Sequence, residues 1–200
     1  MNIQLSIERF LNYLRFEKAY SPITLKSYQA DLRDLADYCE ARSITDPEEL
    51  SYRELHRFVI ELSKRKYKNS TLERKIASLK SLFKYLLKTK AVSNNPASLI
   101  LSPRKEKRLP GVLEGPEITE LLRSLPESKP LEIRDKSMII LLYAAGLRAS
   151  ELVSLNINDV DFKEGFVSVI GKGNKQRIVP TGKTALRQLS QYLGARRELA

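Results

Sequence analysis

Apolar residues in the first hundred positions recur every three or four residues, the spacing of amphipathic helices. Turn signals divide them into four segments: residues 3–17, a second opened by Ser21-Pro22, a third after Asp46-Pro47, and a fourth capped by Ser70. Serine is a common helix cap, and proline fits the first turn of a helix. The fourth segment would bury Leu72, Ile76, Leu79, Phe83 and Leu86. The pattern predicts a four-helix domain over residues 1–100.

The pattern changes in the second half of the chain. Helical spacing covers residues 117–125, 133–145 and 149–154, and three short strands are then predicted at 160–162, 166–170 and 176–180. Lys163-Glu164-Gly165 is a hairpin turn between the first two strands, and Thr181 would cap a last helix. We therefore predict a mainly α protein with a small antiparallel β-sheet, whose second half, residues 112–200, is the first part of an α+β domain.

The two halves are joined by a segment rich in proline and basic residues. Asn94-Asn95-Pro96 ends the fourth helix, and residues 101–111 contain Pro103 and Pro110 among four basic side chains. Such a composition is typical of an extended linker. We predict a basic interdomain linker over 101–111.

Composition excludes several classes of protein. The longest apolar run, Met138–Ala145, is far shorter than the ~20 residues of a membrane span, and the first residues lack the pattern of a signal peptide. One cysteine and one histidine cannot form a disulfide or a conventional zinc site. Cys39 lies on the apolar spacing of the second helix and is predicted to be in the core. We expect a cytoplasmic protein without membrane association, metal or cofactor.

The charge of the chain is strongly positive and unevenly distributed. The net charge is +11. Residues 31–61 hold nine acids and four bases, whereas residues 64–90 hold ten bases and one acid, Glu73. An ordinary solvated surface mixes both signs, so this segregation favours an anionic partner such as nucleic acid. Lys80, Lys84 and Lys88 would line one face of the fourth helix.

Two segments in the second half carry candidate chemistry. Met138–Ala145 is predicted to be a helix buried on all sides and stopped by Gly146, so Arg148 would stand beside a dry core, three residues from Glu151. An always-charged guanidinium in such a place needs an anionic partner. On these residues alone, an Arg148–Glu151 ion pair that merely closes the helix boundary is an equal alternative.

The second segment is a glycine-rich basic turn, Gly171–Arg177, between two predicted strands. It lacks the pattern of a phosphate-binding loop before a helix. A hairpin inserted into a DNA groove fits better, because a lysine there could contact a phosphate or a base. The alternative is a hairpin tip that carries lysines for solubility.

The order of these segments resembles that of the tyrosine recombinases, especially the Xer-type enzymes. The strong matches are Gly146–Leu152 and Gly171–Arg177. Weaker matches in the first half and the linker are Ser21–Tyr28, Ser70–Arg74, Asn95-Pro96-Ala97 and Leu109-Pro110. The resemblance implies a SAM-like core-binding domain over 1–100 and the first part of a tyrosine-recombinase catalytic domain over 112–200.

The family's chemistry implies roles for three residues. Its enzymes use a tyrosine that attacks a DNA phosphate and forms a 3′-phosphotyrosyl bond without a metal. Arg148 matches the first of two phosphate-binding arginines, Glu151 matches a supporting acid, and Lys172 matches the general acid for the leaving 5′-hydroxyl. The implied partners are double-stranded DNA with inverted half-sites and a tetrameric synapse, formed with itself or a paralogous recombinase, in chromosome dimer resolution or integration.

The basic surface, the linker and the hairpin supply the predicted DNA contacts. These are Lys68, Ser70, Thr71, Arg74, Lys75, Lys80, Lys84, Lys88, Arg104, Lys105, Lys175 and Arg177.

The chain departs from the family's pattern after the hairpin. A His-x-x-Arg helix, a later His or Trp and a nucleophilic tyrosine do not follow; His56 is predicted to be a surface residue of the first half, and Tyr192 to be a packing residue. We therefore expect an N-terminal fragment of a recombinase that binds DNA without cleaving it. A non-catalytic DNA-binding or regulatory protein with the same fold is the alternative, and an RNA-binding helical protein is a weaker one.

Overall fold

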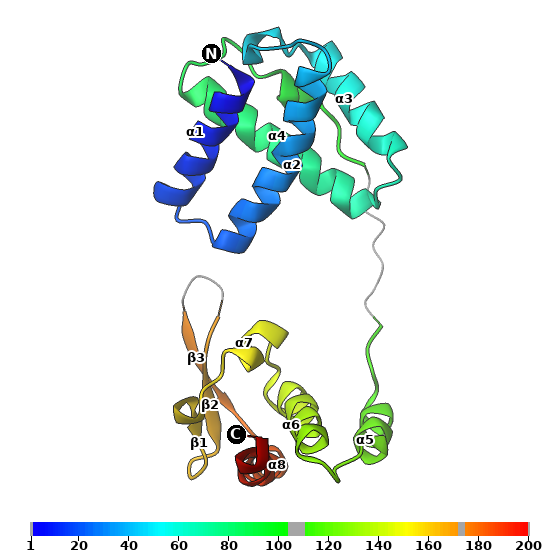
Figure 1. The fold of residues 1–200 in the computed structure, drawn as a ribbon, viewed down its shortest axis with the longest axis vertical. Coiled ribbons are helices and arrows are strands. Elements are labelled where there is room, and N and C mark those ends of the chain that lie inside the picture. Colours follow the sequence, from blue (N-terminus) through cyan, green and yellow to red (C-terminus); the bar gives the residue numbers. More distant parts are fainter. Residues whose placement is uncertain (1, 104–110, 172–174, 200) are drawn as a thin grey trace. The chain divides into compact units, whose positions relative to one another are not determined.

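The computed structural model describes residues 2–103, 111–171 and 175–199 (Figure 1). The chain divides into two compact units, Met1–Arg108 and Leu109–Ala200. The boundary lies inside the segment predicted to be a linker. Most of that linker, including Arg104 and Lys105, lies outside the described residues, as does Lys172.

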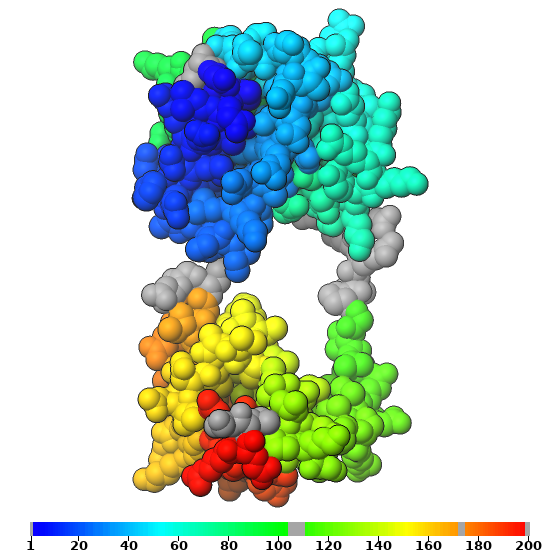
Figure 2. Space-filling model, viewed as in Figure 1, coloured from blue at the N-terminus to red at the C-terminus, as the bar shows by residue number. Residues whose placement is uncertain are grey.

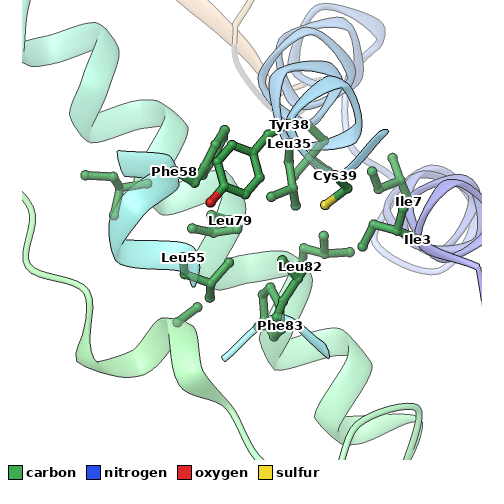
Figure 3. Close-up of a cluster of buried hydrophobic side chains, with 14 of the residues drawn as sticks. Ile3, Ile7, Leu35, Tyr38, Cys39, Leu55, Phe58, Leu79, Leu82 and Phe83 are labelled. Carbon is green, nitrogen blue, oxygen red and sulfur yellow. The ribbon is translucent and has the colours of Figure 1, made fainter. Parts of the chain in front are cut away.

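The described residues of the first unit form four α-helices. They are α1 (Ile3–Phe16), α2 (Pro22–Glu40), α3 (Tyr52–Lys64) and α4 (Asn69–Lys88), with short 3-10 helices η1 (Pro47–Glu49) and η2 (Pro96–Leu99). Side chains from all four helices meet in one apolar core (Figure 3). Cys39 is fully buried there, as predicted, and burial raises the pKa of its thiol to about 11. The five predicted inward positions of α4 are all buried.

Two serine caps were predicted in this unit, and one of them is present. The Ser21 hydroxyl accepts a hydrogen bond from the Thr24 N–H at the start of α2, and Ser51 caps α3 after the η1 turn. The predicted cap at Ser70 is wrong, because α4 begins one residue earlier, at Asn69. The Thr71 N–H donates to the Lys68 carbonyl at 2.9 Å, so Ser70 already lies in the first helical turn.

The second unit packs helices against a small sheet. Its helices are α5 (Gly115–Ser124), α6 (Pro130–Ala145), α7 (Ala149–Val153) and α8 (Lys183–Ala195), with η3 (Ile157–Asp159) and η4 (Arg196–Leu199). The antiparallel strands lie in the order β1 (Val160–Asp161), β2 (Phe166–Ile170) and β3 (Gln176–Pro180). Val167 and Val169 of β2 are buried together with Ile140 and Leu141 of α6. In the space-filling view, the atoms of α5 and α6 (green) and of the strands (yellow to orange) lie together in this unit (Figure 2).

Two predictions about this unit are wrong. Helix α6 is not buried on all sides, because Tyr143 is 59% exposed and only one face, including Ile140 and Leu141, is buried. Thr181 does not cap α8. Its N–H donates to the Gly165 carbonyl at 2.7 Å, which holds Thr181 against the hairpin turn and leaves Gly182 as the cap.

Across the described ranges, the structure contains no helix with both the length and the apolarity to cross a membrane.

Candidate functional site

Arg148 is presented at a sharp turn between α6 and α7. Gly146 ends α6 in the left-handed conformation, with φ of +56°, and the chain then reverses through the buried Leu147. Arg148 is the extended N-cap residue of α7, and its side chain is 65% exposed. The expectation that this guanidinium stands beside a dry core is therefore wrong: it faces solvent, where an anion can reach it.

Glu151 is the buried centre of the site. The residue is 4% exposed, and its carboxylate accepts four hydrogen bonds. Arg148 donates its backbone N–H to Oε2 and its Nη1 to Oε1, both at 2.8 Å. Arg177 donates Nη1 to Oε1 at 2.6 Å and Nη2 to Oε2 at 2.8 Å. The hydrogen bonds from Arg177, followed by the Arg148 backbone N–H, lower the pKa of Glu151 to about 2, so the carboxylate stays ionised.

The Arg148–Glu151 ion pair is thus present, as the alternative interpretation of these two residues predicted. This ion pair occupies one terminal nitrogen of Arg148, and most of the Arg148 side chain remains exposed. The contact therefore orients Arg148 without consuming its capacity to bind an anion, because a guanidinium has five N–H donors.

Arg177 binds Glu151, a contact that the sequence did not predict. It was predicted to contact DNA, and the structure shows both of its terminal nitrogens on Glu151. This ion pair raises the pKa of Arg177. A signal was available, because Arg177 and Val179 alternate with the exposed Gln176, Ile178 and Pro180 along β3 and so share the inner face of the strand.

The base of the basic hairpin is closed by a backbone hydrogen bond. The Gly171 N–H donates to the Lys175 carbonyl at 2.8 Å, and Lys175 is exposed. Residues 172–174 lie outside the described residues, so the predicted role of Lys172 stays a prediction. The base of the hairpin nevertheless lies close to Glu151, because Arg177, two residues after Lys175, binds that carboxylate.

The predicted DNA-contact residues of the first unit lie along α4. Lys68, Ser70, Lys84 and Lys88 are exposed, and Thr71 and Lys80 are half-buried. These side chains form a basic surface on which phosphate contacts remain a prediction. We call Lys80, Lys84 and Lys88 the lysine stripe.

Lys75 differs from its neighbours on α4. The residue is 7% exposed, and its ammonium lies 2.6 Å from Asp34 Oδ2 and 3.3 Å from Asp31 Oδ1. Burial lowers the pKa of Lys75, but the hydrogen bond to Asp34 and the two carboxylate charges outweigh burial and raise it overall. Arg74 also donates to Asp31, at 2.5 Å, and keeps about half of its side chain exposed. The geometry disfavours Lys75 as a phosphate contact.

The other singled-out residues lie apart from this arrangement. His56 is exposed, as predicted, and stacks on Tyr52. Tyr192 is half-buried and lines a cavity of about 460 Å³ together with Leu141 and Leu189. In the part of the chain that the structure describes, no group of three or more His, Cys, Asp or Glu side chains could hold a metal ion.

Comparison with known proteins matches both halves of the chain to family models. Residues 112–199 match the phage integrase family, and residues 7–90 match the N-terminal SAM-like domain of phage integrases. Among curated proteins, the chain is 40% identical over 188 residues to tyrosine recombinase XerD of Listeria innocua, which covers 94% of the chain and 63% of that protein. It is 35% identical over 200 residues to tyrosine recombinase XerC of Anoxybacillus flavithermus, covering 100% of the chain and 67% of that protein. The chain thus spans about two thirds, or slightly less, of the length of these relatives.

A solved structure shares the fold over nearly the whole chain. The XerH site-specific recombinase, bound to a palindromic difH substrate in a post-cleavage complex, aligns with a TM-score of 0.75 at 19% identity. The alignment covers 98% of this chain and 69% of XerH. At this identity the likeness establishes the fold.

Proposed function

The chain belongs to the phage integrase family of tyrosine recombinases, and from this membership we propose that the protein carries out site-specific DNA recombination. The reaction would break and rejoin DNA strands through a 3′-phosphotyrosyl intermediate. Residues 1–100 would form the core-binding domain, 101–111 the linker and 112–200 the first part of the catalytic domain.

One observation carries the proposal: a largely exposed Arg148 held by the buried, ionised Glu151. The planar guanidinium can donate two parallel hydrogen bonds to the non-bridging oxygens of a phosphate. Charge on those oxygens grows as the nucleophile attacks, and a donor that is already oriented stabilises that charge without reorganisation. A structural ion pair alone would not need the rest of the guanidinium to be accessible.

Lys172 would supply the proton for the leaving 5′-hydroxyl. Its loop starts and ends at Gly171 and Lys175, which are joined by a hydrogen bond. A lysine is a weak acid at neutral pH, so the assembled site would have to lower its pKa.

The first unit would supply sequence-independent affinity. The exposed lysines of α4 can neutralise phosphates and release counterions. We propose that two copies bind inverted half-sites and that four form the synapse, with itself or a paralogous recombinase, in the cytoplasm. The palindromic substrate of the XerH complex supports the inverted arrangement.

The decisive experiment compares the 200-residue chain with a longer version, extended at its C-terminus to supply the family's His-x-x-Arg helix and nucleophilic tyrosine. A duplex selected from a random library by the chain would be nicked to trap the covalent intermediate. We expect both proteins to bind the duplex, and only the longer version to form a protein–DNA adduct. Binding without an adduct by the longer version would favour the non-catalytic alternative. An adduct formed by the 200-residue chain would contradict the assignment of Tyr192 as a packing residue.

A further inference from the structure

The hydrogen bonds of Glu151 connect two parts of the site that are distant in sequence. Two of them come from Arg148, three residues away, and two come from Arg177 on β3, 26 residues away. Arg177 meets the carboxylate end-on, with one terminal nitrogen on each oxygen. This bidentate geometry fixes the plane of the carboxylate more firmly than a single contact would.

Gly171 completes this connection from the other side of the hairpin. A Cβ added at Gly171 would lie 3.3 Å from Arg177 Nη1, 3.5 Å from Glu151 Oε1 and 3.5 Å from the Lys175 carbonyl oxygen. The first of these distances is tighter than an ordinary van der Waals contact. Glycine therefore lets the base of the hairpin approach the ion pair closely.

Arg177 is less available to an external phosphate than Arg148 is. Both terminal nitrogens already bind Glu151, and the side chain is 37% exposed, compared with 65% for Arg148. Of the two arginines on this carboxylate, Arg148 is the accessible one.

We propose that Arg177 is a positioning residue: through Glu151 it fixes the orientation of Arg148, and with Gly171 it ties the base of the basic hairpin to the start of α7. The inference rests on the proposed function, since the orientation matters because Arg148 binds phosphate. It replaces the predicted role of Arg177 as a DNA contact.

The test uses the 200-residue chain and inorganic sulfate, a tetrahedral dianion that resembles a phosphodiester in shape. Two quantities are measured by NMR: the order parameter of the Arg148 Nε–H bond, and the sulfate affinity that Arg148→Ala removes. Arg177→Lys keeps the charge but lacks the planar pair of terminal nitrogens, each of which holds one carboxylate oxygen. We expect it to lower the Arg148 order parameter and to weaken sulfate binding roughly fivefold, the loss of about one hydrogen bond. Arg187→Gln, at an exposed position on α8, serves as the control and should change neither quantity.

Three further substitutions keep the test independent of folding defects. Gly171→Ala leaves Arg177 in place but crowds the ion pair, so it should reproduce the Arg177→Lys effect. Gly182→Ala, whose Cβ would meet nothing within 4 Å, should not. In a Glu151→Gln background, Arg177→Lys should have no further effect, because Arg177 acts through that carboxylate.

The outcomes separate the inference from the function on which it rests. If Arg177→Lys and Gly171→Ala leave both quantities at their wild-type values, Arg177 does not position Arg148 and the inference is overturned. If Arg148→Ala does not reduce sulfate affinity, the phosphate role of Arg148 fails. The order parameter still tests the positioning of Arg148 in that case: a fall in Arg177→Lys supports it, and no change overturns it.

Discussion

Replacing Lys75 with methionine separates a structural lysine from a DNA-binding one on the same helix. Methionine keeps most of the apolar stem and removes the ammonium that lies between Asp31 and Asp34. The matched variant is Lys84→Met, at an exposed position of the lysine stripe. The account predicts opposite effects of the two changes on stability and on DNA binding.

The magnitude follows from the burial of the three charges. The side chains of Lys75 and Asp31 are 7% and 1% exposed, and removing one partner of a buried ion pair typically costs about 3–5 kcal/mol. Both carboxylates keep another partner, Arg74 on Asp31 and Arg65 on Asp34, which reduces the expected cost to or just below the lower end of that range, about 2–3 kcal/mol. For a unit of this size that loss lowers the melting temperature by roughly 10–20 °C.

The assay combines thermal unfolding with DNA binding at several salt concentrations. Lys75→Met should melt earlier and, below its melting temperature, keep the wild-type slope of log affinity against log salt. Lys84→Met should melt within a few degrees of wild type and lose roughly 0.9 from that slope if it contacts one phosphate. A Lys75→Met protein of wild-type stability with a reduced slope would refute the structural assignment.

Three other predictions concern the second unit and the linker. Hydrogen bonds from Arg177 and Arg148 lower the pKa of Glu151 to about 2. The ionised carboxylate therefore contributes fully to the stability of the fold at a pH above the ordinary glutamate pKa of about 4.3, and this contribution is lost as the pH falls from there to about 2. Denaturant titrations between pH 7 and 2.5 should show this acid loss in wild type and less of it in Glu151→Gln; identical pH dependence would contradict the lowered pKa. In the longer protein, Lys172→Ala should slow strand cleavage with a 5′-hydroxyl leaving group far more than with a 5′-thiol, which needs no acid; equal slowing would make Lys172 a binding contact. We also predict that residues 101–111 form a hinge that lets the two halves close around a duplex. Trypsin should then cut first after Arg104, Lys105, Lys107 or Arg108, and bound DNA should slow the cut; equal rates would argue against such closure.

Local patterns predicted most of the elements. The apolar spacing of α4 identified its buried face because each helix exposes one stripe to the core. The strands were also found, and β2 and β3 have the predicted bounds. Ser70 and Thr181 were misjudged as caps because a hydroxyl near a helix start has the same local signature whether it lies before the helix or at its edge.

The sequence predicted only some of the contacts in the candidate site. Arg148 and Glu151 are three residues apart, so their contact could be predicted from helical spacing. The contact of Arg177 with Glu151 spans 26 residues and that of Lys75 with Asp31 spans 44. Both depend on how separate elements pack, which periodicity does not specify, so both side chains were taken for DNA contacts.

The central claim is that Arg148 binds the reacting phosphate, and covalent trapping with the longer protein tests it most directly. Arg148→Ala removes the oriented donor pair, and losing one such donor commonly costs ~3 kcal/mol or more in the transition state. We expect adduct formation on a nicked duplex to slow by at least about 100-fold, while the affinity for intact duplex changes only a few-fold. Adduct formation by Arg148→Ala at a rate close to that of wild type would contradict the account.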